Sequence, residues 1–150
     1  PGITAQGGLG DDTIAVDARG PIFGINSTVE VAGGDGTDVF DVAIDARVTY
    51  DDEDESGEVI PVLGLTVTDF EPGIDKLEVD PLATDVFGYS LLNARLDDDG
   101  AGGTNLVMRY MPDDETVPNR DVYIALSGAD VAWDDISFTG DTQPTLLASA

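Results

Sequence analysis

The 150-residue chain carries 31 acidic against 6 basic residues, a formal net charge of −25, and contains neither cysteine nor histidine. This composition excludes disulfides, thiolate or histidine metal sites, and nucleophiles activated by histidine. Such an acidic surface repels nucleic acid and anionic membranes, so we expect neither as a partner. No stretch is long and apolar enough for membrane insertion.

The length corresponds to one domain with a core of its own. Most of the acidic residues are aspartate, which favours turns and calcium ligation over exposed helices. General salt adaptation is an alternative source of the charge, since Lys76 is the single lysine of the chain. The chain opens Pro1-Gly2-Ile3 with no methionine and no cleavable signal, so we expect a fragment of a larger protein.

A nine-residue pattern occurs twice near the N-terminus, over residues 7–15 and again over residues 33–41. Both copies read Gly-Gly-x-Gly-x-Asp-x-U-x, where U is a large apolar residue; Asp12 aligns with Asp38 and Ile14 with Phe40. The glycines allow positive φ, so the backbone can turn its carbonyl groups inward. The aspartate adds a carboxylate, and Ca²⁺ takes oxygen ligands of both kinds. The pattern predicts calcium-binding loops; two Gly-Asp turns without a metal are the alternative.

The spacing of the two copies predicts how the loops are arranged. They begin at Gly7 and Gly33, 26 residues apart, whereas a regular roll of nine-residue half-turns stacks equivalent loops roughly every 18 residues. We assign the excess to an enlarged loop over Asp17–Ser27, between short strands at Thr13–Val16 and Thr28–Val31. Residues 1–12 are then a lead-in and the first loop, the two glycine loops stack directly, and a calcium ion bridges them.

The middle of the chain predicts longer strands. From Val42 to Tyr50, apolar residues alternate with mostly polar ones, which is typical of a strand with one buried face. The acidic run Asp51–Glu58 that follows is a solvated loop or, alternatively, a further calcium site. We predict a strand over Val59–Phe70, bent at Pro61 and Gly64. A tight turn follows at Pro72-Gly73, and Leu77 and Val79 begin the next strand.

The C-terminal half predicts further short strands and a tail. The strands are expected over Phe87–Leu96, Asn105–Met111, Val122–Leu126 and Asp134–Phe138. Asp97–Gly103 is expected to be a hairpin loop, because it lacks the alternating acidic spacing of an EF-hand. We expect Trp133 in the core or half-buried, and not as a ligand platform. The pattern predicts no structure for Thr142–Ala150.

This order of elements resembles the C-terminal region of RTX proteins, which carry the hemolysin-type calcium-binding repeat; serralysin-type secreted metalloproteases are the familiar example. The resemblance covers roughly residues 5–140 and rests on the two nonapeptides and on the segment from Asp69-Phe70 through Asp75-Lys76. It implies an all-β fold, a short parallel β-roll stacked around calcium and capped by antiparallel strands. It also implies one domain, with the roll at 5–45, capping strands at 46–140 and a tail at 141–150.

The predicted metal ligands come from the loops and from the turn after them. The bridging site is expected to use the side chains of Asp12 and Asp38 with carbonyl groups of neighbouring loop residues. Asp69 is expected to close a second site against the Gly33 loop. The full set of candidate ligands is Asp12, Asp38, Gly8, Gly10, Gly34, Gly36, Asp69, Asp35, Asp11 and Asp75.

The resemblance implies a non-catalytic module that folds on meeting extracellular calcium and supports type I secretion and stability of a larger secreted bacterial protein. The partners would be calcium ions, a type I exporter that reads the C-terminal tail, and an upstream domain of the same protein. A frayed tail without that role is the alternative for residues 141–150. A calcium-stiffened adhesion or surface-layer module, associated with the cell surface, is the alternative function. Glycoside cleavage by a carboxylate pair is a third, for which the few aromatic residues offer little support.

Overall fold

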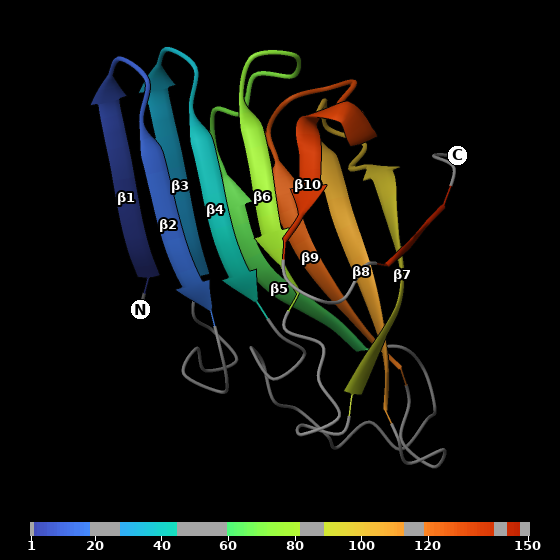
Figure 1. The fold of residues 1–150 in the computed structure, drawn as a ribbon. Coiled ribbons are helices and arrows are strands. Elements are labelled where there is room, and N and C mark those ends of the chain that lie inside the picture. Colours follow the sequence, from blue (N-terminus) through green and yellow to red (C-terminus); the bar gives the residue numbers. More distant parts are fainter. Residues whose placement is uncertain are drawn as a thin grey trace.

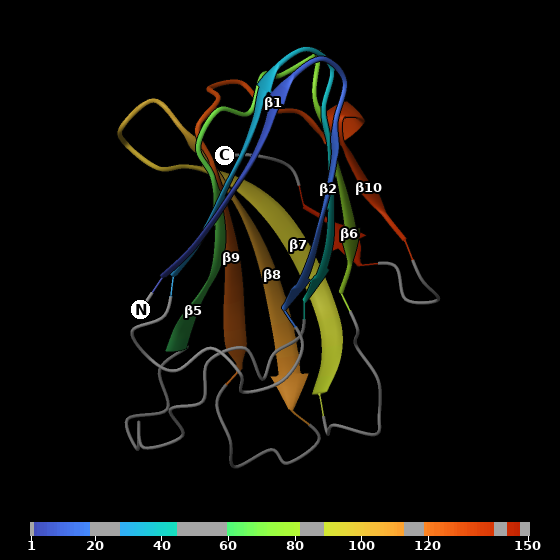
Figure 2. The same cartoon turned by 90° about the vertical axis from the view of Figure 1, so that its left-hand side faces the viewer.

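The computed structural model describes residues 2–18, 28–44, 60–81, 89–112, 119–139 and 144–147. These residues form an all-β fold of two facing sheets (Figures 1 and 2). The larger sheet has the strand order β1-β3-β5-β9-β8-β7-β11, and the smaller has the order β10-β6-β4-β2. No helix in the described ranges is long and apolar enough to cross a membrane.

The first six strands wind as a β-roll. Odd strands enter the larger sheet and even strands the smaller one, so each pair of consecutive strands with its connecting turn forms one coil (Figure 1). The strands of the three coils are β1 Gly2–Leu9 and β2 Thr13–Ala18, β3 Thr28–Asp35 and β4 Val39–Ile44, and β5 Ile60–Val67 and β6 Lys76–Asp80. The predicted parallel β-roll is therefore confirmed.

The first two coils are related by a constant shift of the chain. Gly2 pairs with Thr28 and Gly8 with Gly34 between β1 and β3, and Thr13 pairs with Val39 between β2 and β4. Every one of these pairs is parallel, and the separation equals the spacing of the two nonapeptides. The predicted direct stacking of the glycine loops is confirmed. The third coil continues the same parallel pairing, through β3 with β5 and β4 with β6.

The C-terminal strands extend both sheets. β7 Tyr89–Asp98, β8 Thr104–Pro112 and β9 Arg120–Leu126 pair antiparallel, as predicted for the cap. β9 also pairs parallel with β5, and β10 Ile136–Phe138 pairs parallel with β6. The cap therefore shares the hydrogen-bonded sheets and the core of the roll.

Several predicted boundaries were wrong. Residues 2–9 are a strand and not a lead-in, because pairing along β3 supplies backbone hydrogen bonds that a glycine-rich sequence does not suggest. The strand expected over Asp134–Phe138 begins only at Ile136, after a 3-10 turn at Trp133–Asp135. The tail is not without structure: β11 Thr145–Leu146 pairs parallel with β7.

Other predictions fall outside the described residues. These are the part of the enlarged loop from residue 19 to 27, the continuation of the alternating strand beyond residue 44, and the acidic run over residues 51–58. Of the bends predicted at Pro61 and Gly64, the second coincides with a shift in the register of β5 against β9 between Leu63 and Leu65. The Pro72-Gly73 turn and the hairpin before β8 are also confirmed.

The core lies between the two sheets. Inward-facing side chains alternate with outward-facing ones along each strand, so Phe40 and Val42 of β4 are fully buried while Asp41 between them is exposed. Phe40 packs against Phe70 of the third turn, with ring centroids 6.1 Å apart. Burial of an aromatic side chain of this size contributes about 1.5–3 kcal/mol. This packing fixes the turns relative to the sheets.

Candidate metal centre

The two glycine loops, residues 7–12 and 33–38, have the same backbone conformation. The second and third glycines of each nonapeptide lie at positive φ: Gly8 at 111°, Gly10 at 97°, Gly34 at 93° and Gly36 at 130°. An L side chain rarely adopts this region, so the tight turn selects glycine there. The predicted positive φ is confirmed at these four positions.

The first glycine of each copy has a different requirement. A Cβ atom at Gly7 would lie 2.7 Å from Oδ2 of Asp12, and one at Gly33 would overlap Oδ2 of Asp38. Each aspartate therefore folds back across its own loop onto the first glycine. This close approach explains why the aspartate stands five positions after the first glycine in both copies.

Carbonyl groups of the first loop face the second loop. A Cβ atom at Gly34 would overlap the carbonyl oxygen of Gly8, and one at Gly36 would overlap that of Gly10. These two oxygens thus lie between the stacked loops. The loops bring together the oxygen types that the sequence predicted as ligands.

Aspartates of successive turns form a ladder. The Asp12 backbone N–H donates to Oδ1 of Asp38 at 3.0 Å, and the Asp38 backbone N–H donates to Oδ1 of Asp75 at 3.0 Å. These three residues immediately precede β2, β4 and β6. Each of the two hydrogen bonds joins the aspartate of one coil to the aspartate of the next. The ladder links Asp75 to the nonapeptide pair, although its turn lacks the nonapeptide pattern.

Two carboxylate oxygens of the ladder have no hydrogen-bond partner among the described residues. They are Oδ2 of Asp12 and Oδ2 of Asp38, and both atoms are buried. The Asp38 side chain is 0% exposed. A buried ionised oxygen without a donor is unfavourable by several kcal/mol unless a cation or a proton meets it. A cation or a proton at these two oxygens would therefore stabilise the nonapeptide loops.

The Asp75 carboxylate of the third turn has a hydrogen-bond donor for each of its oxygens. Oδ2 of Asp75 accepts a hydrogen bond from the Glu71 backbone N–H at 2.9 Å, so both of its oxygens are paired. Asp69 lies against the Gly33 loop as predicted. Its two oxygens accept from the backbone N–H groups of Gly33 at 2.9 Å and Gly34 at 2.8 Å, so the Asp69 carboxylate acts there as a hydrogen-bond acceptor for the loop.

The remaining two candidates lie at the exposed side of the loops. Asp11 is exposed, and its Oδ1 accepts from the Thr37 backbone N–H at 2.8 Å, which links the two loops. Asp35 is also exposed, and its carbonyl oxygen accepts from the Gly10 N–H at 2.8 Å. Both residues hold the loops in register without contacting the buried oxygens.

Asp135 belongs with these turn aspartates, although it is not among the ligands predicted from the sequence. Its Oδ1 accepts from the Gly73 N–H at 3.0 Å, and its Oδ2 accepts from the Ala132 N–H at 3.1 Å. Lys76 Nζ lies 3.7 Å from Oδ1. In the sequence, Asp135 stands directly before a short apolar strand, as Asp12, Asp38 and Asp75 do. This position is the feature by which Asp135 could have been predicted.

The oxygens at the glycine loops fit a hard divalent cation such as Ca²⁺. In the described ranges no three acidic side chains come together as a metal-binding group. A cation held here would therefore need backbone carbonyls, which calcium accepts readily. Oδ2 of Asp12, Oδ2 of Asp38 and the carbonyls of Gly8 and Gly10 are the oxygens that would hold it.

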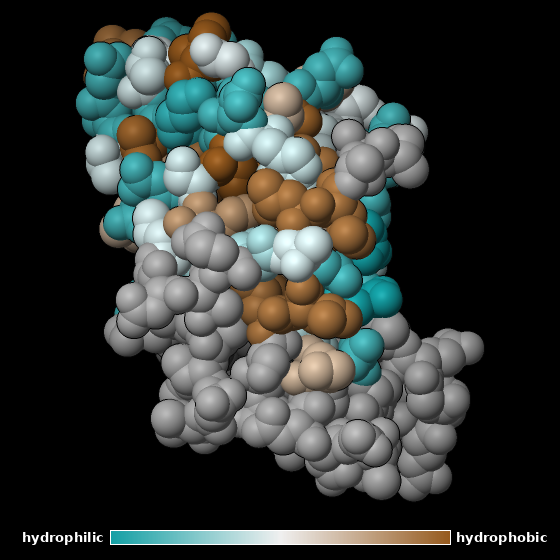
Figure 3. All heavy atoms as spheres, turned by 45° about the vertical axis from the view of Figure 1, so that its right-hand side comes forward, coloured by the Kyte–Doolittle hydropathy of each residue, from teal (hydrophilic) through white to brown (hydrophobic). Residues whose placement is uncertain are grey.

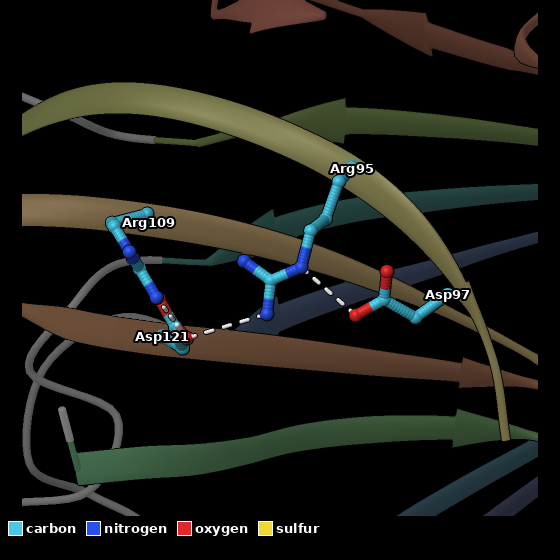
Figure 4. A network of polar contacts seen from close by, with 4 residues as sticks. All are labelled: Arg95, Asp97, Arg109 and Asp121. Atoms are coloured by element: carbon cyan, nitrogen blue, oxygen red, sulfur yellow. Dashed lines mark hydrogen bonds and ion pairs between the residues drawn. The ribbon is translucent and has the colours of Figure 1, made fainter. Parts of the chain in front are cut away.

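A second polar cluster lies on the outer face of the larger sheet (Figure 4). Arg109 donates to both carboxylate oxygens of Asp121, at 2.9 and 3.1 Å, and Arg95 lies 3.6 Å from the same carboxylate while donating to Asp97. The hydrogen bonds that Arg109 donates to the Asp121 carboxylate raise the pKa of Arg109. All four charges are paired with one another, as expected for a structural network.

Comparison with known proteins gives little further information. No family model matches the chain, and no curated protein sequence does. Among solved structures the chain is similar to the AlgE6R3 subunit of the Azotobacter vinelandii mannuronan C5-epimerase, with 18% identity, 95% of this chain and 90% of that chain covered, and a TM-score of 0.31. At this TM-score the likeness carries no argument about the function of this chain.

Proposed function

We propose that this chain is a non-catalytic, calcium-binding β-roll module. The observation that carries the proposal is the pair of buried carboxylate oxygens, Oδ2 of Asp12 and Oδ2 of Asp38, which have no described partner inside two stacked glycine loops. The other buried turn carboxylates, such as Asp75, accept backbone N–H groups and have the role of structural acceptors. A calcium ion would supply the positive charge that the two loops lack.

Calcium binding and folding are coupled in this proposal. Asp12 and Asp38 belong to different coils, so their oxygens meet only when β1 stacks on β3 and β2 on β4. Binding free energy is then folding free energy. A ligand present at a hundredfold excess over its Kd contributes about 2.7 kcal/mol per site. Calcium concentration would thus decide whether the first two coils are ordered.

The biological role that follows is support of secretion and stability in a larger protein. With calcium scarce, the net charge of −25 favours a loose chain that an exporter can thread. With calcium abundant outside the cell, the roll closes. In this proposal residues 141–150 are read by a type I exporter, the upstream domain of the same protein is the cargo, and the folded module is extracellular, in the medium or at the bacterial surface.

The calcium proposal is tested by far-UV circular dichroism during calcium titration of the EDTA-treated chain, with magnesium as the control cation. We expect a gain of β signal with calcium alone, and its loss in the Asp12→Ala/Asp38→Ala double variant. Asp41→Asn is the matched control, because Asp41 is exposed on the outer face of β4. A folded spectrum that is the same with and without calcium would refute the coupling and leave salt adaptation as the source of the charge.

Secretion is tested separately by deleting residues 141–150 and measuring export from a host with a type I exporter. We expect export to be lost while the purified variant still folds with calcium. Because β11 pairs with β7 along this segment, the calcium titration of the deletion variant is the necessary control. Undiminished export would rule out the tail as the signal.

A further inference from the structure

Exposed apolar side chains gather at one edge of the larger sheet. Leu92 of β7, Met111 of β8 and Leu146 of β11 are 43%, 46% and 47% exposed, and Leu147 directly follows β11 with 38%. β8, β7 and β11 are the last three strands of that sheet. Figure 3 faces this side of the molecule and shows hydrophobic side chains gathered on its surface. Single exposed leucines are ordinary, whereas a group of them is typical of an interaction surface.

A β-bulge contributes one of these side chains. The register of β7 against β8 pairs Leu91 with Tyr110 and Asn93 with Arg109, so Leu92 is an extra residue without a partner in the ladder. Leu91 packs against the core, while Leu92 is exposed. Bulges redirect side chains and are characteristic of sites with a role beyond pairing. The bulge thus adds a leucine at the surface without changing the pairing on either side of it.

The same strands lack the acidic side chains that dominate the chain. Acidic residues occupy 31 of the 150 positions, yet none occurs in residues 89–96, 104–112 or 144–147. The charged residues of these segments are Arg95 and Arg109, and both are paired, with Asp97 and Asp121. The edge is therefore apolar and close to neutral, on a molecule with a net charge of −25.

This charge pattern distinguishes the kinds of partner that fit the edge. A basic partner is attracted to carboxylates and gains no electrostatic attraction from a surface without them. A strongly acidic partner is repelled by the carboxylates elsewhere on the molecule and approaches closely at a neutral, apolar surface. A second copy of this chain is an acidic partner present at equal concentration. Two copies of one apolar surface are also self-complementary, as a two-fold interface requires.

We propose that the edge formed by Leu92, Met111, Leu146 and Leu147 is the interface of a homodimer, in which two copies bury these side chains against each other about a two-fold axis. The two charges of −25 oppose this association, so salt strengthens it by screening the repulsion. None of the four side chains belongs to the glycine loops. The dimer therefore needs the folded strands and makes no use of the candidate metal centre.

The first test is sedimentation equilibrium of the full chain with calcium present, in about 0.1 M and about 1 M NaCl, between which the Debye length falls from about 10 Å to about 3 Å. We expect a monomer–dimer equilibrium whose dissociation constant is at least tenfold lower at the higher salt concentration. Larger aggregates without a defined dimer would overturn the inference, since salting-out and not a two-fold interface would then explain the association.

Substitutions locate the interface. Leu92→Glu and Leu146→Glu should each weaken the dimer at least tenfold, because each places two like charges at the two-fold contact. Ile74→Glu is the matched control: Ile74 is 46% exposed in the turn before β6, so the charge and exposure are similar but the position lies outside the edge. Met111→Gln, which adds no charge, should also weaken the dimer. Far-UV circular dichroism in calcium checks that each variant is folded.

Hydrogen exchange of the unsubstituted chain tests the same surface without any variant. Raising the protein concentration at high salt should slow exchange in residues 89–93 and 144–147 and leave exchange in β1 and β3 unchanged. A chain that stays monomeric at every salt and protein concentration would overturn the inference and leave the edge to a different protein. A dimer that withstands Leu92→Glu and Leu146→Glu, or that Ile74→Glu weakens equally, would place the interface elsewhere and overturn it as well.

This inference can fail independently of the calcium proposal. If the chain folds without calcium and still forms the salt-promoted dimer, the interface stands and the metal role falls. If calcium drives folding and the folded chain stays monomeric, the metal role stands and the interface falls.

Discussion

Adjacent glycines of the second loop are constrained for different reasons. Gly34 has φ +93° and needs the left-handed region, whereas Gly33 does not lie at positive φ. Gly33 is constrained by space, because a Cβ atom there would overlap the Asp38 carboxylate. A side chain at Gly34 would therefore strain the backbone, whereas one at Gly33 would displace the carboxylate of Asp38, a candidate ligand.

We predict that Gly33→Ala destabilises the calcium-loaded chain more than Gly73→Ala does. Gly73 also lies at positive φ, 82°, but a Cβ atom there has nothing within 4 Å. We expect about 1 kcal/mol for Gly73→Ala from strain alone, and about 2–3 kcal/mol for Gly33→Ala from overpacking. Urea unfolding in calcium measures both. Equal costs would show that Asp38 is free to move aside.

Asp38→Asn should weaken calcium binding at least tenfold, which corresponds to about 1.4 kcal/mol. The reason is that a neutral amide replaces a carboxylate whose Oδ2 is buried without a described partner. The amide is similar in size, so the fold without calcium should not lose stability. Isothermal titration calorimetry against calcium gives the affinity, with Asp41→Asn as the exposed control on the same strand. Unchanged affinity in Asp38→Asn would exclude this carboxylate as a ligand.

At the scale of elements, the outer face of β7, β8 and β9 is held by the arginine–aspartate network. Asp121 on β9 is 3% exposed, although it lies on the solvent side of the sheet. Its cover is provided by the stems and guanidinium groups of Arg109 and Arg95 (Figure 4). The network therefore links three strands that the core alone would hold only from the inner face.

Arg109→Ala should cost about 1.5–3 kcal/mol of unfolding free energy, because two charge-assisted hydrogen bonds to a buried carboxylate are lost. Arg95→Ala should cost about 1 kcal/mol or less, since Arg95 makes one hydrogen bond to the half-buried Asp97 and a longer contact to Asp121. Thermal unfolding of the two variants in calcium gives the order. A larger cost for Arg95→Ala would contradict the assignment of Arg109 as the main partner.

The hairpin between β7 and β8 gives a pH prediction. Hydrogen bonds from the backbone N–H groups of Ala101 and Gly103 lower the pKa of Asp99 below its ordinary value of 3.8. A lowered pKa contributes stability that is present above 3.8 and is lost as pH falls through the folded-state pKa. The Asp99 carboxyl should thus titrate below 3.8 in an NMR pH titration, with loop amide shifts following it. Titration at or above 3.8 would exclude the closed loop in solution.

Over the whole molecule, the turn carboxylates differ in how they are satisfied. In the first two coils, Asp12 and Asp38 each keep a buried oxygen without a described donor. Farther along the roll, Asp69, Asp75 and Asp135 each accept two hydrogen bonds from backbone N–H groups. The buried oxygens that a cation or a proton would stabilise are therefore at the N-terminal end of the roll.

Removal of calcium should loosen the molecule unevenly. In EGTA we expect amide hydrogens of β1 to β4 to exchange at least tenfold faster than in calcium, while those of β8 and β9 change little. The reason is that β8 and β9 are held by the buried core and the arginine network, without metal. Hydrogen exchange with mass spectrometry compares the segments in one sample. Uniform loss of protection would mean that the whole roll folds as one calcium-dependent unit.

The sequence by itself determined the all-β class, the two glycine loops, their stacking and the approach of Asp69 to the Gly33 loop. These depend on short-range chemistry: glycine where φ is positive or space is lacking, aspartate at the turn, and alternation along the strands. Equal spacing of two identical patterns then dictates a parallel register.

Only the tertiary structure decided which aspartates keep an unpaired oxygen. Asp75 and Asp38 look equivalent before an apolar strand, but Glu71 donates a hydrogen bond to Asp75 and nothing described donates to Oδ2 of Asp38. Pairing across the sheets also turned residues 2–9 and 145–146 into strands. The strand partners lie far away in the sequence, and the Glu71 donor depends on the path of one turn. Local residue propensities carry no information about either.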